Sequence, residues 1–197
     1  MLAVAEWSFT SFLVAIAPTE PNKIFWATLG YLGVTATPVL FFIFSLEFST
    51  QQNWLRNRVL RPIWIIPLVT VIIAFTNTWT GWLWDNFTYI PETNILVFSP
   101  GPFSPIANAY SYLLIFASIL VLIRAVVIFK EGYRFQAIVT LIAALFPVIA
   151  NLAFVLNKIP ITGLDLTPYA FVITGIIIAG ASNIFNISIP FQSPGTS

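Results

Sequence analysis

The chain has 197 residues, of which 58% are hydrophobic and only 8% are charged, and its net charge is +1. A soluble domain carries roughly 25% charged residues, so this chain has too few charges to cover a water-soluble surface, and the surplus apolar surface must face lipid. No basic run or acidic tail indicates a nucleic-acid partner. We therefore expect an all-α, polytopic transmembrane helix bundle of about six membrane helices in a lipid bilayer, with no nucleic-acid partner.

The apolar segments agree with this expectation. A helix needs about 20 apolar residues to cross a bilayer core of roughly 30 Å, and lipid-facing backbone requires helices or closed barrels. The runs lack the period-2 alternation of barrel strands, so helices are predicted. The predicted helices cover residues 2–17, 24–46, 62–79, 105–129, 135–157 and 166–187. The first is short and contains Glu6, so whether it crosses the membrane stays open. We expect a bundle over residues 1–190 and a short cytoplasmic tail over 191–197.

The connections follow from proline, glycine and polar residues. Residues 18–22 (P-T-E-P-N) should end the first helix, because proline cannot continue one. Residues 81–104 form a long connection that is rich in aromatic side chains. These side chains could be an aromatic belt at the lipid boundary, which we favour, or a lid over an outward-facing pocket. We expect Thr167 to cap the last helix and Pro168 to take its first position.

The arginines and lysines predict the orientation. Arg56, Arg58 and Arg61 lie in one loop, and Arg124, Lys130 and Arg134 surround another. By the positive-inside rule both loops belong on the cytoplasmic side. The C-terminus is then also cytoplasmic, in what we expect to be a prokaryotic inner membrane.

Few residues could carry chemistry. Cysteine and histidine are absent, which excludes disulfides, thiolate or imidazole metal ligands and a histidine-based triad. No nucleophile–base pair or metal-ligand spacing is present, so we expect no enzymatic activity, no metal and no cofactor. Glu6, Glu47 and Arg124 lie in or at the ends of helices. For Glu47 and Arg124 we favour positions at the interface or a mutual pair over a functional role.

A second group of polar and aromatic residues should face outward. Asn108 and Tyr112 are four apart and share a helix face, and Asn151 lies in the outer half of its helix. Such residues could line a ligand pocket between helices or serve as interhelical hydrogen-bond contacts. The second interpretation is favoured, and both stay open. The candidate ligand-binding residues are Trp26, Tyr31, Asn108, Tyr112, Asn151, Asp165 and Tyr169.

A series of short motifs resembles a known family. In chain order they are K-I-F-W-A from Lys23, Y-L-G from Tyr31 with Pro38, Thr76-Asn77 with Trp84, Gly101-Pro102 with A-Y-S-Y from Ala109, Y-R-F-Q-A from Tyr133, and P-I-T-G-L-D-L-T-P over 160–168. The series resembles the N-terminal seven-helix membrane region of bacterial and archaeal sensor histidine kinases, which also precedes cyclic-dinucleotide synthases. The resemblance implies a membrane sensor module.

Three departures from that pattern shape the functional hypotheses. The resemblance makes residues 2–17 the second family helix, so we expect the first to be missing. The family's histidine pair is replaced by residues 78–81, and we expect no phosphotransfer domain to follow. The favoured hypothesis is a sensory or ligand-binding module without a catalytic output domain, served by a separate output protein. The alternative is a structural or accessory subunit of a larger membrane complex, with other subunits packing against residues 2–17. A transporter or channel is less favoured, because no matched repeat is visible.

Overall fold

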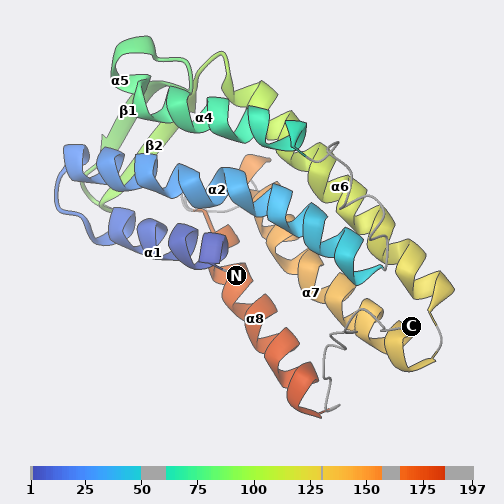
Figure 1. Ribbon diagram of the computed structural model, residues 1–197. Helices are drawn as coiled ribbons and strands as arrows, with labels where there is room; N and C mark the ends of the chain where they lie inside the picture. The colour runs from blue at the N-terminus through green and yellow to red at the C-terminus, as the bar shows by residue number, and fades with distance from the viewer. Residues whose placement is uncertain (1, 50–60, 130, 157–164, 185–197) are drawn as a thin grey trace.

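The computed structural model describes residues 2–49, 61–129, 131–156 and 165–184. Within them the chain is a helix bundle with one β-hairpin (Figure 1). The predicted all-α bundle is confirmed in its mostly helical character, but the hairpin, which occupies much of the connection over residues 81–104, was not predicted. The predicted tail over 191–197 lies outside the described residues.

The helices occur close to where the sequence placed them. Their bounds are α1 Leu2–Ile16, α2 Glu20–Phe48, the 3₁₀ turn η2 Pro62–Trp64, α4 Ile65–Phe75, α5 Asn77–Thr80, α6 Ser104–Ile128, α7 Glu131–Val155 and α8 Thr167–Ile184. The predicted break over 18–22 is shorter than expected, because α2 already begins at Glu20. Pro21 lies in its first turn, where a missing N–H needs no partner. The predicted helix over 62–79 divides into η2, α4 and α5.

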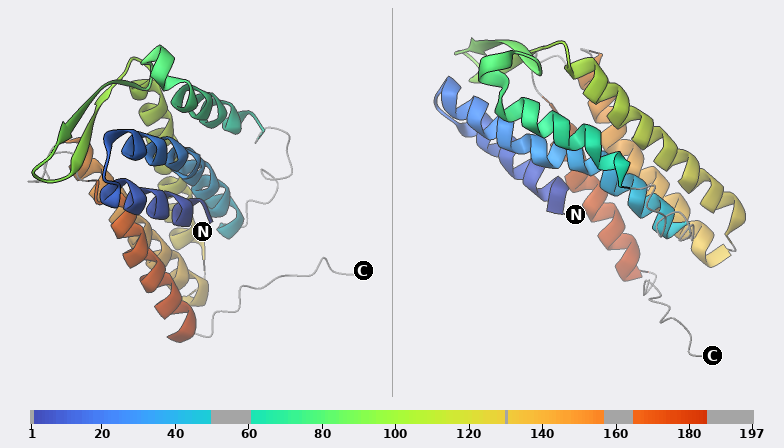
Figure 2. Two further views of the ribbon diagram at one scale, coloured as in Figure 1. Left: turned by 90° about the vertical axis from the view of Figure 1, so that its left-hand side faces the viewer. Right: turned by 45° about the horizontal axis from the view of Figure 1, so that its top comes forward.

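The helices pack in a ring. Neighbouring pairs are α1 with α2, α2 with α6, α6 with α7, α7 with α8, and α8 with α1. Helix α4 lies outside this ring against α2 and α6, as the two views in Figure 2 show. Many large apolar side chains stay on the outer surface, among them Leu68, Phe116 and Ile176. An outward apolar surface of this extent is suited to lipid.

Three of the described helices are long and apolar enough to cross a membrane, namely Glu20–Phe48, Ser104–Ile128 and Arg134–Phe154. The apolar segments Leu2–Ile16, Pro62–Phe75 and Thr167–Ile177 are shorter. The structure thus supports a polytopic membrane protein, and the count of six crossings stays a prediction.

Small residues bring α1 close to α2. A Cβ atom on Gly30 would lie 2.8 Å from Thr10 Oγ1, and one on Gly33 would lie 2.9 Å from Trp7 Cβ. At Gly33 the close atoms are fixed to the α1 backbone, so only glycine fits there, whereas at Gly30 the Thr10 side chain would have to move. Small residues of this kind permit close helix approach.

The hairpin pairs β1 (Trp84–Ile90) with β2 (Ile95–Pro100) in antiparallel register, with Phe87 opposite Phe98. Aromatic and β-branched residues favour such strands. Its turn ends at Asn94, whose φ of 53° is in the left-handed region that asparagine tolerates. The Trp84 ring packs 5.1 Å from Phe98 and 5.0 Å from Tyr31 of α2, measured between centroids. The hairpin therefore folds onto the bundle through an aromatic core.

Part of the aromatic connection remains outside this core. Trp82 is 56% exposed, whereas Trp84 is 6% exposed. The position of Trp82 suits a belt at the lipid boundary, and Trp84 instead serves to attach the hairpin.

A buried asparagine holds the start of the hairpin. Asn77 Oδ1 accepts hydrogen bonds from the N–H groups of Leu83 and Trp84, both at 2.9 Å, and its Nδ2 donates to the Trp84 carbonyl at 2.9 Å. Gly101 closes the other end, because a Cβ there would lie 2.5 Å from the carbonyl oxygens of Gly81 and Trp82.

The C-terminal end of α1 is held by two side chains from elsewhere. Lys23 is fully buried, and its Nζ donates to the Val14 carbonyl at 2.7 Å and the Ala15 carbonyl at 3.4 Å. Asn94, in the hairpin turn, donates to the Ala15 carbonyl at 3.1 Å. The last carbonyls of a helix have no partners inside it, and a cation suits that end of the helix dipole. The hairpin tip and α1 are thereby joined.

Candidate functional site

A chain of hydrogen bonds joins α6, α7 and α8 at the end of the bundle where the hairpin lies. The Tyr112 hydroxyl of α6 donates to Asn151 Oδ1 of α7 at 2.5 Å. Asn151 Nδ2 donates to Thr167 Oγ1 of α8 at 3.3 Å. The Thr167 N–H donates to Asp165 Oδ1 at 2.9 Å. Three of the predicted ligand residues, Tyr112, Asn151 and Asp165, thus lie in one network.

Asp165 caps α8, a role that the sequence analysis assigned to Thr167. Its carboxylate accepts the N–H two residues ahead, a local bond that short acidic side chains favour. The Thr167 hydroxyl is instead used by Asn151. Thr167 is itself the first helical residue and Pro168 the second, so the predicted cap was wrong by two residues. The reason is position: Thr167 lies inside the helix, whereas a capping side chain belongs to a residue before it.

Burial raises the pKa of the Asp165 carboxyl above its ordinary value of 3.8, and hydrogen bonds from Thr167 lower it in part. Removing a charged group from water disfavours the ionised form. Tyr31 of α2 packs edge-on against Trp84, and no hydrogen bond between described residues joins its side chain to this network.

The remaining predicted ligand residues stand apart from this network. Asn108 is exposed, and Tyr169 is 53% exposed. Trp26 is half-buried and packs against Phe25 with ring centroids 5.1 Å apart. No hydrogen bond between described residues joins any of the three to Asn151.

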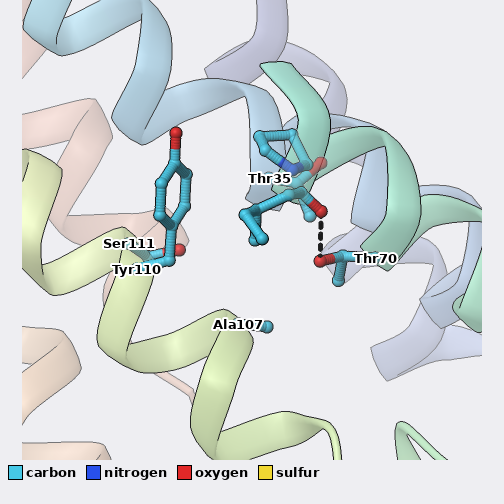
Figure 3. A pocket seen from close by; sticks show the side chains of 7 residues that line it. Thr35, Thr70, Ala107, Tyr110 and Ser111 are labelled. Carbon is cyan, nitrogen blue, oxygen red and sulfur yellow. Dashed lines mark hydrogen bonds between the residues drawn. The ribbon is translucent and has the colours of Figure 1, made fainter. Parts of the chain in front are cut away.

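A small polar cavity between α2, α4 and α6 was missed by the sequence analysis. Its volume is about 10 Å³ as the space open to the centre of a water molecule, room for about one water. Figure 3 shows it between Thr35 of α2, Thr70 of α4 and the α6 residues Ala107, Tyr110 and Ser111. The dashed bond runs from Thr70 Oγ1 to the Ile66 carbonyl, 2.7 Å away. Thr35 and Thr70 are isolated polar residues on apolar helices, and the sequence does not indicate that they line one cavity.

The charged residues within helices have different surroundings. Glu47 and Arg124 are both exposed, and no ion pair joins them among the described residues. The interface position expected for them is therefore compatible with the structure, whereas a mutual pair is absent from the part described. Glu6 has one buried carboxylate oxygen, Oε2, to which no described residue donates a hydrogen bond. Within the described ranges no group of three or more acidic residues could hold a metal ion.

The fold and these contacts define a polytopic helical membrane protein with a polar junction at one end. The family model for the N-terminal 7TM region of histidine kinase matches residues 1–186, so the chain belongs to this family. No curated protein and no solved structure matches the chain.

The structure explains the role of one residue in each of two family-like motifs. Asn77, which follows Thr76, holds the hairpin by its buried side chain, and Gly101 permits the close approach of Gly81 and Trp82. Of the motif over 160–168, the structure describes only 165–168, where Asp165 caps α8. Residues 160–164 and Arg56, Arg58, Lys130 and Lys158 lie outside the described residues.

Proposed function

We propose that the chain is the sensing part of a membrane receptor, which binds a small ligand at the junction of α6, α7 and α8 and catalyses no reaction itself. Membership of the histidine kinase input family supports a sensor role. The proposed position of the ligand site rests on the chain of hydrogen bonds through Tyr112, Asn151, Thr167 and Asp165.

The composition of the junction suits recognition of a polar ligand. Between three apolar helices it brings together a phenol, an amide, a hydroxyl and a half-buried carboxylate. Convergent polar groups in a largely apolar surrounding are typical of ligand sites in helix bundles. A ligand that exchanges bonds with Asn151 would alter the contacts of α6 and α8 together, since Asn151 bonds to both.

The proposed orientation places this junction outside the cell. Arg61 precedes η2 and Arg134 lies in the first turn of α7, at the opposite end of the bundle from the hairpin. By the positive-inside rule that end is cytoplasmic. In this arrangement α1, α2, the unit from η2 to α5, α6, α7 and α8 each cross the bilayer of the cell membrane, and α8 approaches the cytoplasm, where an output domain or separate output protein would receive the signal.

The test is native mass spectrometry of the chain in lipid nanodiscs, after incubation with a dialysate of bacterial culture medium. We expect a bound small molecule on the wild type and on Asn108→Ala, whose exposed amide serves as the matched control. We expect Asn151→Ala to lose it. Binding that survives Asn151→Ala would refute the site. A chain that binds no small molecule and is recovered in a stable complex with other membrane proteins would favour the accessory-subunit alternative.

A further inference from the structure

A proline inside a helix leaves one backbone carbonyl without its usual donor. Pro147 lies inside α7, and the N–H that it lacks would have bonded to the carbonyl of Ala143, four residues earlier. In lipid few waters can replace such a bond, so a side-chain donor to that carbonyl stabilises the helix. The Thr174 hydroxyl of α8 donates to this Ala143 carbonyl at 2.7 Å. A side chain of one helix therefore repairs the defect that proline makes in the next.

A second hydroxyl also bonds to a backbone carbonyl of a neighbouring segment, but no proline frees that carbonyl. Ile63 belongs to the 3₁₀ turn η2, and Pro67 lies in the first turn of α4, where a missing N–H needs no partner. The Tyr110 hydroxyl of α6 donates to the Ile63 carbonyl at 2.5 Å. Of these two interhelical bonds, the one from Thr174 reaches a carbonyl that a proline inside a helix has freed.

Several other helix hydroxyls in this bundle bond within their own helix. Ser118 donates to the Leu114 carbonyl at 2.7 Å, within its own helix. Thr35 and Thr70 do the same, each with the carbonyl four residues earlier. Bonding to its own helix is the ordinary solution for a hydroxyl among apolar neighbours. The bond to Ala143 differs from these because it reaches a neighbouring helix, and it is shorter than the 3.5 Å bond from Ser8 of α1 to the Pro168 carbonyl of α8.

Thr174 has a second acceptor within reach. Its hydroxyl also approaches the Ala170 carbonyl of its own helix at 3.1 Å. The hydroxyl has one proton, which it divides between the two acceptors. If α8 moved away from α7, the hydroxyl would keep its bond to the Ala170 carbonyl, whereas the Ala143 carbonyl would lose its hydrogen-bond donor. The position of α8 thus decides which bond is made.

This bond lies on the same seam as the candidate site. Thr174 is seven residues beyond Thr167 on α8, and Ala143 is eight before Asn151 on α7, so both bonds join the antiparallel helices in matching register. At 1.5 Å per residue they are about 11 Å apart along the seam. A shift of α8 at one bond therefore displaces the other.

We propose that the bond from Thr174 to the carbonyl freed by Pro147 is a latch that holds α8 in position on α7, and that its release lets α8 move. The proposal rests on these contacts and holds whether or not a ligand binds at the Asn151 junction.

The test is a double-mutant cycle with Thr174→Val and Pro147→Ala. Interhelical hydrogen bonds in membranes are worth about 0.6–1.7 kcal/mol, so Thr174→Val should lower the folding equilibrium constant about 3- to 20-fold. In a Pro147→Ala background the new N–H can donate to the Ala143 carbonyl, and the same change should have little effect. Thr174→Ser keeps the hydroxyl and should resemble the wild type. Ser118→Ala removes a bond within one helix, so it should change the folding equilibrium constant by the same factor in both backgrounds.

A second measurement reports position instead of stability. The chain contains no cysteine, so spin labels can be attached to cysteines at Ile149 of α7 and Val172 of α8, which are 63% and 57% exposed. We expect Thr174→Val to shift or broaden the distance distribution and Thr174→Ser to leave it unchanged. An equal loss of stability from Thr174→Val in both backgrounds, or an unchanged distance distribution, would overturn the latch. If Pro147→Ala fails to fold, the distance measurement on Thr174→Val, with Thr174→Ser as its control, decides alone.

Discussion

Replacing Gly33 by alanine should separate α1 from α2. The added Cβ would overlap Glu6 Oε2 and the Ala3 carbonyl oxygen, and would lie 2.9 Å from Trp7 Cβ. The Ala3 and Trp7 atoms are fixed to the backbone of α1, so no side-chain rotation relieves the contact and the helix itself must retreat. Overpacking of this kind costs about 1–3 kcal/mol, whereas alanine gains up to about 1 kcal/mol over glycine in helix propensity. We expect a net loss of about 1–2 kcal/mol in the free energy of unfolding.

The assay is reversible denaturant unfolding in detergent micelles, followed by tryptophan fluorescence. Gly175→Ala is the matched control, because a Cβ at Gly175 meets nothing within 4 Å. That variant should be neutral or slightly stabilising. Equal stability of the Gly33→Ala and Gly175→Ala proteins would refute the argument that contact between α1 and α2 demands glycine.

Three further predictions concern the hairpin, the α8 cap and the end of α1. Asn77→Ala leaves two N–H groups and one carbonyl without partners, so at about 1–3 kcal/mol for each unsatisfied group the hairpin should become sensitive to proteolysis near 91–94. The exposed Asn86→Ala control should stay resistant, and equal cleavage of both would count against this role. Because the folded pKa of Asp165 is raised, the folded chain holds the proton more tightly than the unfolded chain, and the free energy of unfolding should fall as pH rises from about 3.8 to the raised pKa. A pH series of unfolding curves checks this, and Asp165→Asn should abolish that fall; an unchanged pH dependence would contradict it. Lys23→Met removes the donor to the Val14 and Ala15 carbonyls, which should cost about 1–3 kcal/mol and speed protease cleavage at 17–19, whereas Lys23→Arg should keep most of the protection; wild-type cleavage of Lys23→Met would argue against the cap.

Much of the helical order could be predicted because it depends on local composition. The apolar runs that became α6 and α7 are bounded by turn residues, so their ends fell within a few residues of prediction. The hairpin was not predicted, since residues 81–104 were interpreted as an irregular connection. Its strands are short, and they are stabilised by contacts of Trp84 with Tyr31, more than 50 positions away in the chain.

The candidate site was predictable only in part. Tyr112, Asn151 and Asp165 were selected because polar residues on apolar helices need partners, and the structure joins them through Thr167. Asn108 was selected for the helix face that it shares with Tyr112, yet it is exposed. A spacing of four residues places two side chains on one face, but it does not say where the neighbouring helix ends.

The sequence by itself determined that this chain belongs in a membrane and where its helices run, because hydrophobicity and helix-ending residues act over short distances. Only the tertiary structure decided which hydroxyl meets which carbonyl. Pro147 and Thr174 are 27 positions apart, and their relation exists only because α7 and α8 pack antiparallel in one register. A hydrogen bond depends on distances of a few tenths of an ångström, which no local pattern of residues specifies.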